Sequence, residues 1–365
     1  MNRVIRIVAF VALATPGLAQ EKAPPQSAAN SFPGPDFILR DKDLKTQKGG
    51  VVLGPMESDG KGGTKGSFAV FGGPSLIQVG SLAFSADGKI LAVGSTPGRV
   101  DLWDVDTRKK LRTVEGGSTI ALSPDGRKLA KDGNGIEIRD AANGKLLRRI
   151  PWSLTTSTPG VQRTIKRLEF NPSGNLLLVS SNGENDLVFS VSSGELVATL
   201  TATQQGQFSR DGAFVAGGNA KHLIEWNTKD WTKVSDVPNG PDYVTQIAAF
   251  PERDLAVVGG PKNARLVHMS SGEEVAKVGQ GYTNFAAFSD DGTLILTYSS
   301  SRFGVWDTTG KQYCYKEDLG NGTVALSADS RWLAAAMVNG GTSVAIWNLR
   351  SALSACGVPP PAKSP

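Results

Sequence analysis

The sequence predicts an all-β protein in which seven small antiparallel sheets are arranged around a ring. Its length of 365 residues, with 43 Gly and 20 Pro, is ample for such a body. Short apolar strands alternate with Gly, Asp, Ser and Asn turns, as in a β-meander. A Ser-x-Asp-Gly-like turn, degenerate in some copies, follows the first strand of each unit and begins at residues 85, 123, 171, 209, 251, 289 and 327.

Each unit reads as four strands. The turn after the first strand is Ser85-Ala86-Asp87-Gly88 in the first copy, and its Gly supplies the positive φ of a tight reversal. Since aspartate side chains bond nearby backbone N–H groups in such turns, we interpret these residues as turn formers rather than catalytic groups: Asp87, Asp125, Asp211 and Asp291. The third strand ends on an aromatic residue in four copies: Trp103, Trp226, Trp306 and Trp347.

A four-stranded sheet of about 40 residues has two faces and cannot cover both alone. Stacking the sheets face to face buries them, and radial closure leaves only short edges. The predicted fold is therefore a seven-bladed β-propeller of four-stranded antiparallel blades.

Residues 82–116 resemble one WD repeat, and the resemblance to WD-repeat β-propellers extends over about residues 66–350. It implies that the first strand of each blade is innermost and the fourth outermost, and that an N-terminal strand completes the last blade. We expect Ser67–Phe71 to pair with the blade that contains Trp347. The Gly-His dipeptide of the family is absent, since His222 and His268 lie elsewhere. This departure fits divergent bacterial exported members.

Residues 1–19 have the pattern of a signal peptide. Arg3 and Arg6 precede an apolar stretch, and Gly17-Leu18-Ala19 predicts cleavage after Ala19. We therefore expect a periplasmic or secreted protein with no membrane insertion after cleavage. Residues 20–65 are predicted to be a flexible or irregular linker, in which Phe37–Leu39 and Val51–Leu53 could be short strands. Residues 66–356 form the predicted propeller, and residues 357–365 a Pro-rich disordered tail.

The composition argues against several kinds of chemistry. Two His and two Cys exclude zinc clusters of Cys and His ligands and disfavour His-based catalysis. No nucleophile elbow, His-Glu-x-x-His helix or phosphate loop is present. We therefore expect no metal, no cofactor and no catalytic residues. The net charge of +5 falls to +3 without Arg3 and Arg6, and the basic residues are scattered, so nucleic acid is not an expected partner.

The remaining candidate site is the face that carries the loops between second and third strands and between successive blades, which we call the top face. Aligning the third strands places Arg99, His222 and Arg302 at one position, with Asp186 there in the third copy. Tyr243 and Tyr282 lie in the loops that lead into the fifth and sixth copies, and the insertion 151–165 enlarges the face. Basic and aromatic residues on a rim can bind a partner, although ordinary solvated loops would look the same.

Three functions stay open: a noncatalytic protein-interaction scaffold, which we favour; a propeller enzyme resembling a lactonase or quinone-dependent dehydrogenase; and a small-ligand or carbohydrate binder of the cell envelope. An enzyme would need carboxylates and a metal, or a planar cofactor, in the central channel. The sequence leaves open whether Cys314 and Cys356 form a disulfide. It does not define the oligomeric state, and a monomer is the working expectation.

Overall fold

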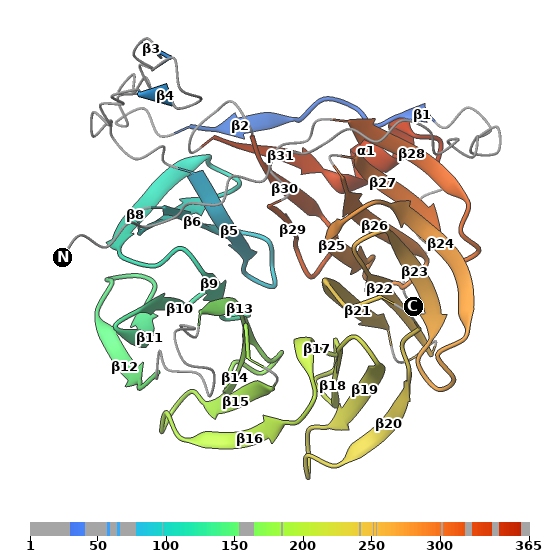
Figure 1. Cartoon of the computed structure of the whole chain (residues 1–365). Helices are drawn as coiled ribbons and strands as arrows, with labels where there is room; N and C mark the ends of the chain where they lie inside the picture. The colour runs from blue at the N-terminus through green and yellow to red at the C-terminus, as the bar shows by residue number, and fades with distance from the viewer. Residues whose placement is uncertain are drawn as a thin grey trace.

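Seven sheets of four or five strands are arranged in a ring, which confirms the predicted all-β, seven-bladed propeller (Figure 1). The innermost strands line a central channel. The structure is a computed structural model that describes residues 30–40, 57–58, 64–65, 78–96, 98–152, 164–183, 185–240, 242–250, 252, 254–300, 302–317, 323–337 and 343–358. The insertion 151–165 lies mostly outside the described residues, as do residues 1–29 and 359–365.

Six blades are formed by consecutive strands that follow one another from the channel outward. Blade 1 contains β5 (Gln78–Phe84), β6 (Ile90–Thr96), β7 (Arg99–Asp104) and β8 (Lys109–Glu115). Blade 2 contains β9 (Ile120–Leu122), β10 (Lys128–Gly133), β11 (Gly135–Asp140) and β12 (Leu146–Ile150). Blade 3 contains β13 (Ile165–Phe170), β14 (Leu176–Ser181), β15 (Asp186–Ser190) and β16 (Leu196–Leu200).

The next three blades repeat this order. Blade 4 contains β17 (Gln204–Phe208), β18 (Phe214–Gly218), β19 (His222–Asn227) and β20 (Lys233–Pro238). Blade 5 contains β21 (Gln246–Phe250), β22 (Leu255–Gly259), β23 (Asn263–His268) and β24 (Glu274–Gln280). Blade 6 contains β25 (Thr283–Phe288), β26 (Leu294–Ser299), β27 (Arg302–Asp307) and β28 (Gln312–Glu317). A separate hairpin joins β3 (Glu57–Ser58) and β4 (Thr64–Lys65).

Blade 7 combines both ends of the described chain. Its inner strands are β29 (Val324–Leu326), β30 (Trp332–Ala336) and β31 (Val344–Asn348), and its outermost strand is β2 (Phe37–Leu39), antiparallel to β31. An N-terminal strand thus closes the ring, as predicted. The strand chosen from the sequence was wrong, because Phe37–Leu39 occupies the place expected for Ser67–Phe71, and residues 67–71 lie outside the described residues. The propeller therefore draws on residues before 66.

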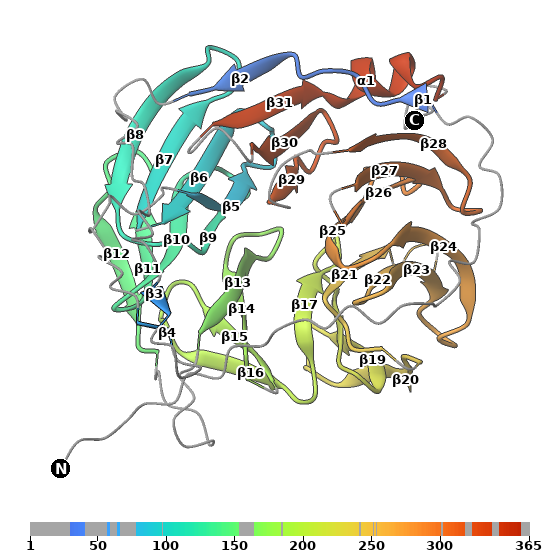
Figure 2. The ribbon, with the colours of Figure 1, turned by 45° about the horizontal axis from the view of Figure 1, so that its top comes forward.

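A second N-terminal strand, β1 (Asn30–Ser31), pairs in parallel with β28 and gives blade 6 a fifth strand. Figure 2 shows residues 30–39 running along the outside of blades 6 and 7, past the helix α1 (Leu349–Ala355). Between β1 and β2, Phe32 is buried at 1% exposure and meets Phe303 edge to face, with ring centroids 5.0 Å apart. We call residues 30–39 the N-terminal arm.

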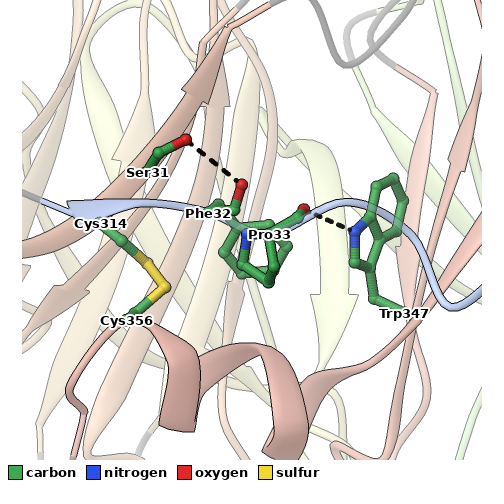
Figure 3. The surroundings of a disulfide bond; sticks show 6 residues. All are labelled: Ser31, Phe32, Pro33, Cys314, Trp347 and Cys356. Carbon is green, nitrogen blue, oxygen red and sulfur yellow. Dashed lines mark hydrogen bonds between the residues drawn. A yellow bond between two sulfur atoms is a disulfide. The ribbon is translucent and has the colours of Figure 1, made fainter.

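Cys314 of β28 and Cys356, which follows α1, form a disulfide with a Cα–Cα distance of 5.7 Å. Both cysteines are buried. Figure 3 shows the disulfide beside the arm, where the indole N–H of Trp347 donates to the Pro33 carbonyl at 3.1 Å. The disulfide and the arm therefore fasten α1, blade 6 and blade 7 to one another.

The turns explain why the repeat begins at serine. In the first unit, the Ser85 hydroxyl donates to Asp87 at 2.7 Å and accepts from the Ile90 N–H at 3.0 Å. The same Asp87 carboxylate accepts from the Lys89 N–H at 3.1 Å. Equivalent serine–aspartate hydrogen bonds occur at Ser123, Ser209, Ser289 and Ser327. These contacts confirm that the turn aspartates hold the reversals.

The hydrophobic core lies between blades rather than within one. Trp103 of blade 1 packs with Trp332 and Ile346 of blade 7, which are buried in the same cluster. The positive-φ turn glycines complete the fit, since a Cβ on Gly88 would lie 2.9 Å from the Trp332 side chain. Each blade is thus buried by its neighbours, and the loops that join them are presented at the two ends of the ring.

Candidate functional site

The five residues selected from the sequence all lie on the top face. The loops that form this face meet there, because the Gly116 N–H donates to the Gly98 carbonyl at 2.7 Å and the Asn239 N–H donates to the Lys221 carbonyl at 2.9 Å. Three candidates begin the third strands of their blades, namely Arg99, His222 and Arg302. The loops before β21 and β25 carry Tyr243 and Tyr282, which are exposed at 51% and 47%.

The structure divides these residues into two groups. His222, Tyr243, Tyr282 and Arg302 belong to blades 4, 5 and 6, which are neighbours in the ring. Arg99 belongs to blade 1, which blade 7 separates from blade 6. The candidate site is therefore the top face of blades 4–6, and Arg99 is not part of it.

Every basic candidate already has an acidic partner on its own blade. The Arg99 guanidinium donates to Asp101 at 2.9 and 3.1 Å. His222 Nδ1 lies 2.7 Å from Asp236, whose pKa is lowered by the hydrogen bond from Lys233 and by the nearby His222. Because each local charge is compensated in this way, the patch is less cationic than the sequence suggests.

Arg302 lies at a groove between blades 5 and 6. Its guanidinium pairs with Glu317 and stands over the Tyr315 ring, 4.8 Å from the centroid. The groove has a volume of about 530 Å³ and is also lined by Gln280, Ser300 and Trp306. The Ser300 hydroxyl accepts from the Tyr282 N–H at 3.0 Å, which links the groove to the loop that carries this tyrosine. The groove therefore lies beside the loop that carries Tyr282 and could receive a side chain of a partner.

Asp186 does not share the position of the basic candidates. It pairs with Leu200, whereas Arg99 pairs with Glu115 and Arg302 with Glu317. Phe189 occupies in blade 3 the position that Trp103 has in blade 1. Asp186 lies three residues before Phe189, whereas Arg99 lies four residues before Trp103, so Asp186 is one residue further into the strand. The other six blades fill that position with buried apolar residues: Val100, Ile136, Leu223, Ala264, Phe303 and Val344.

Asp186 is fully buried between blades 3 and 4. Its Oδ2 accepts the Gly206 N–H at 2.7 Å, and a Cβ on Gly206 would lie 2.7 Å from the same oxygen. Burial raises the pKa of Asp186 to about 7, although that hydrogen bond and the charge of Arg167 lower it. Burial also raises the pKa of Glu169, which lies 2.8 Å from Arg167.

The central channel has a volume of about 1040 Å³ and is lined by the innermost strands of all seven blades. Both signs of charge line it among the described residues: Lys166, Arg167, Glu169, Arg210, Asp290 and Asp329. The Arg210 guanidinium reaches the Asp290 carbonyl and so links blades 4 and 6. The sequence analysis did not select these residues. Alternation along β13 would have pointed to Arg167 and Glu169, whereas Arg210, Asp290 and Asp329 lie in the turns after the first strands of their blades.

Blade 2 contains a second buried ionic cluster. Glu137 is paired with Lys131 at 3.1 Å, Arg139 at 2.7 Å and Arg149 at 2.9 Å. Burial alone would raise the pKa of Glu137, but the hydrogen bonds from Arg139, Lys131 and Arg149 lower it to about 2. Because every charge has a partner, the cluster is best explained as structural.

The part of the chain that the structure describes contains no group of three or more His, Cys, Asp or Glu side chains that could hold a metal ion. Within the same residues, no helix is long and apolar enough to cross a membrane.

Comparison with known proteins gives one family. Residues 67–104 match the model of the WD domain, G-beta repeat. A search of curated proteins gave no match to this chain. The matched segment contains the first three strands of blade 1, and the remaining blades repeat their turn, strand order and outward direction. The chain is therefore a WD-repeat β-propeller with seven blades.

Proposed function

We propose that this protein is a noncatalytic scaffold that binds a protein partner through the top face of blades 4–6. The observation that supports this most directly is the pair of exposed tyrosines, Tyr243 and Tyr282, on successive loops of one face. Tyrosine supplies large, rigid contact area and a polar tip, and it is enriched where protein interfaces carry most of their binding energy.

The charges of the site indicate the character of the partner. Arg302 and His222 are held by Glu317 and Asp236, so neither is free to attract a strongly acidic ligand. The groove beside Arg302 offers hydroxyl, amide and indole groups. These features favour an uncharged polar segment with one side chain that enters the groove.

We further propose that the protein works after export, in the periplasm or outside the cell. The support is the signal-peptide pattern of residues 1–19, together with the buried pair Cys314–Cys356, because disulfides persist in oxidising compartments.

Site-specific crosslinking in cells tests the scaffold. A photoreactive residue at Tyr243 or Tyr282 should yield a discrete crosslinked partner, and the same residue at Lys229, an exposed turn at the opposite end of blade 4, should not. Lys262 is an exposed residue of the loop between β22 and β23 on the top face. The double variant Tyr243→Ala/Tyr282→Ala, which leaves the buried core intact, should lower the yield from a probe at Lys262 by about tenfold. Equal yields from Lys229, or an unchanged yield in the double variant, would contradict this function.

A further inference from the structure

The outer strands of blades 1–5 form open edges of their sheets among the described residues. Each of these outer strands has an exposed aliphatic residue at the same register position. It directly follows the residue that pairs with the aromatic position of the third strand, as Leu111 follows Lys110, the partner of Trp103. These residues are Leu111 at 54%, Leu147 at 47%, Val197 at 42%, Val234 at 54% and Val275 at 41% exposure. The edges are therefore alike at this position. If only one of them pairs with a further strand, they must differ at other positions.

The difference lies in the next two positions of each edge. Charged residues occupy one or both of them in four blades: Arg112–Thr113, Arg148–Arg149, Ser235–Asp236 and Ala276–Lys277. Charges on an edge strand prevent another strand from pairing with it. Blades 3 and 6 have no charge there, since they carry Ala198–Thr199 and Cys314–Tyr315.

In blade 6, the uncharged edge is covered by a strand. Asn30 and Ser31 of β1 pair with Cys314 and Tyr315, and the Phe32 N–H donates to the Tyr315 carbonyl at 2.7 Å. In blade 3, no described residue covers the equivalent Ala198 and Thr199. Blade 6 thus shows that an uncharged edge can accept a further strand, and among the described residues the uncharged edge of blade 3 has none.

The open strand β16 has the sequence Leu196-Val197-Ala198-Thr199-Leu200, with no charged residue in it. Antiparallel pairing of two copies about Ala198 would place the exposed Val197 opposite the exposed Thr199. Both residues are β-branched, and such cross-strand pairs stabilise a sheet. The same pairing of β12 would place Arg148 opposite Arg148, which is unfavourable.

We infer that two copies of this chain associate through β16 about a two-fold axis, which joins blade 3 of each copy into one eight-stranded sheet. This departs from the monomer expected from the sequence. It does not depend on the function proposed for the top face, because blades 4–6 carry that face.

The test measures the mass of the full chain in solution and how that mass changes when a charged residue is introduced into one edge strand. Light scattering and sedimentation should give a dimer at about 100 µM protein, which dissociates on dilution. Val197→Lys and Thr199→Lys should each raise the dissociation constant by more than about tenfold. The matched control is Val275→Lys, which changes the same register position on β24 at nearly the same exposure.

Two measurements complete the test. Circular dichroism should show the same fold in all four proteins, and the backbone amides of residues 196–200 should exchange more slowly in the dimer than in the dilute monomer. A wild-type monomer at about 100 µM would overturn the inference and leave a strand from another protein as the remaining occupant of β16. Equal dissociation of the Val197→Lys and Val275→Lys proteins would overturn it as well.

Discussion

Asp186 shows how one carboxylate can make the stability of a propeller depend on pH. Its pKa of about 7 exceeds the ordinary 3.8, so the folded state holds a proton that the unfolded state releases. As pH rises from 3.8 towards 7, the free energy of unfolding therefore falls. At 1.36 kcal/mol per pKa unit, the loss is about 4 kcal/mol. Arg167 and Glu169, whose charges act on the same site, do not remove the shift.

We predict that Asp186→Asn makes the protein more stable by about 4 kcal/mol at pH 8 and by only about 1.6 kcal/mol at pH 5, because most of the loss in the wild-type protein occurs between these two pH values. The amide stays neutral, and its oxygen can still accept the Gly206 N–H. Urea unfolding at the two pH values measures the difference. Glu169 titrates in both proteins, so the comparison reports on Asp186. An equal change at pH 5 and pH 8 would show that Asp186 is not the titrating group.

The same residue marks a limit of reasoning from sequence. Blades 1, 4, 6 and 7 could be aligned on their tryptophans, and their strands lie where the alignment placed them. Blade 3 has Phe189 in place of tryptophan, and the alignment put Asp186 one position away from its true pairing. A shift of one residue changes the face of a strand, so an exposed residue was expected where a buried one stands.

At the scale of single elements, the N-terminal arm shows which strand could not be assigned from the sequence. Phe37–Leu39 and Ser67–Phe71 both look like short apolar strands, and nothing in either segment states its partner. The choice is made by contacts distant in sequence: the Asp36 N–H donates to the Ile346 carbonyl at 2.9 Å, and Arg108 stands 4.4 Å above the Phe37 ring. Local turns were predictable because their partners lie within five residues.

We predict that the double variant Cys314→Ala/Cys356→Ala loses about 2–4 kcal/mol of unfolding free energy. The disulfide closes a sequence separation of 42 residues, and its loss frees that loop in the unfolded chain. Alanine avoids burying a hydroxyl group at either site. Urea unfolding with and without reductant provides the measurement.

Reductant should lower the stability of the wild-type protein to that of the alanine variant and leave the variant unchanged. A wild-type protein that keeps its full stability after complete reduction would contradict a stabilising role for the disulfide. Mass spectrometry of the alkylated protein establishes that reduction is complete.

For the whole molecule, closure of the ring depends on the N-terminal arm. β2 is the outer strand of blade 7, and Asp36 also accepts the Asn348 N–H, so the two ends of the described chain hold each other. Without the arm, β31 becomes an open edge, and Phe32 and Leu39 no longer fill their buried sites. Blade 7 buries its other face against blade 1, which explains why one short strand should affect the entire ring.

We predict that a chain that begins at residue 41 is less stable than one that begins at residue 30 by at least about 4 kcal/mol. Removal of a buried Phe or Leu side chain alone costs about 2–5 kcal/mol. A synthetic peptide of residues 30–40 added to the shorter chain should restore part of the loss, increasingly so at higher peptide concentration, because it binds only the folded ring. A peptide of the same length with Phe32 and Phe37 replaced by Ser should not restore it. Thermal and urea unfolding of the two chains, with each peptide, decide the matter: equal stability of both chains would mean that blade 7 closes without β2.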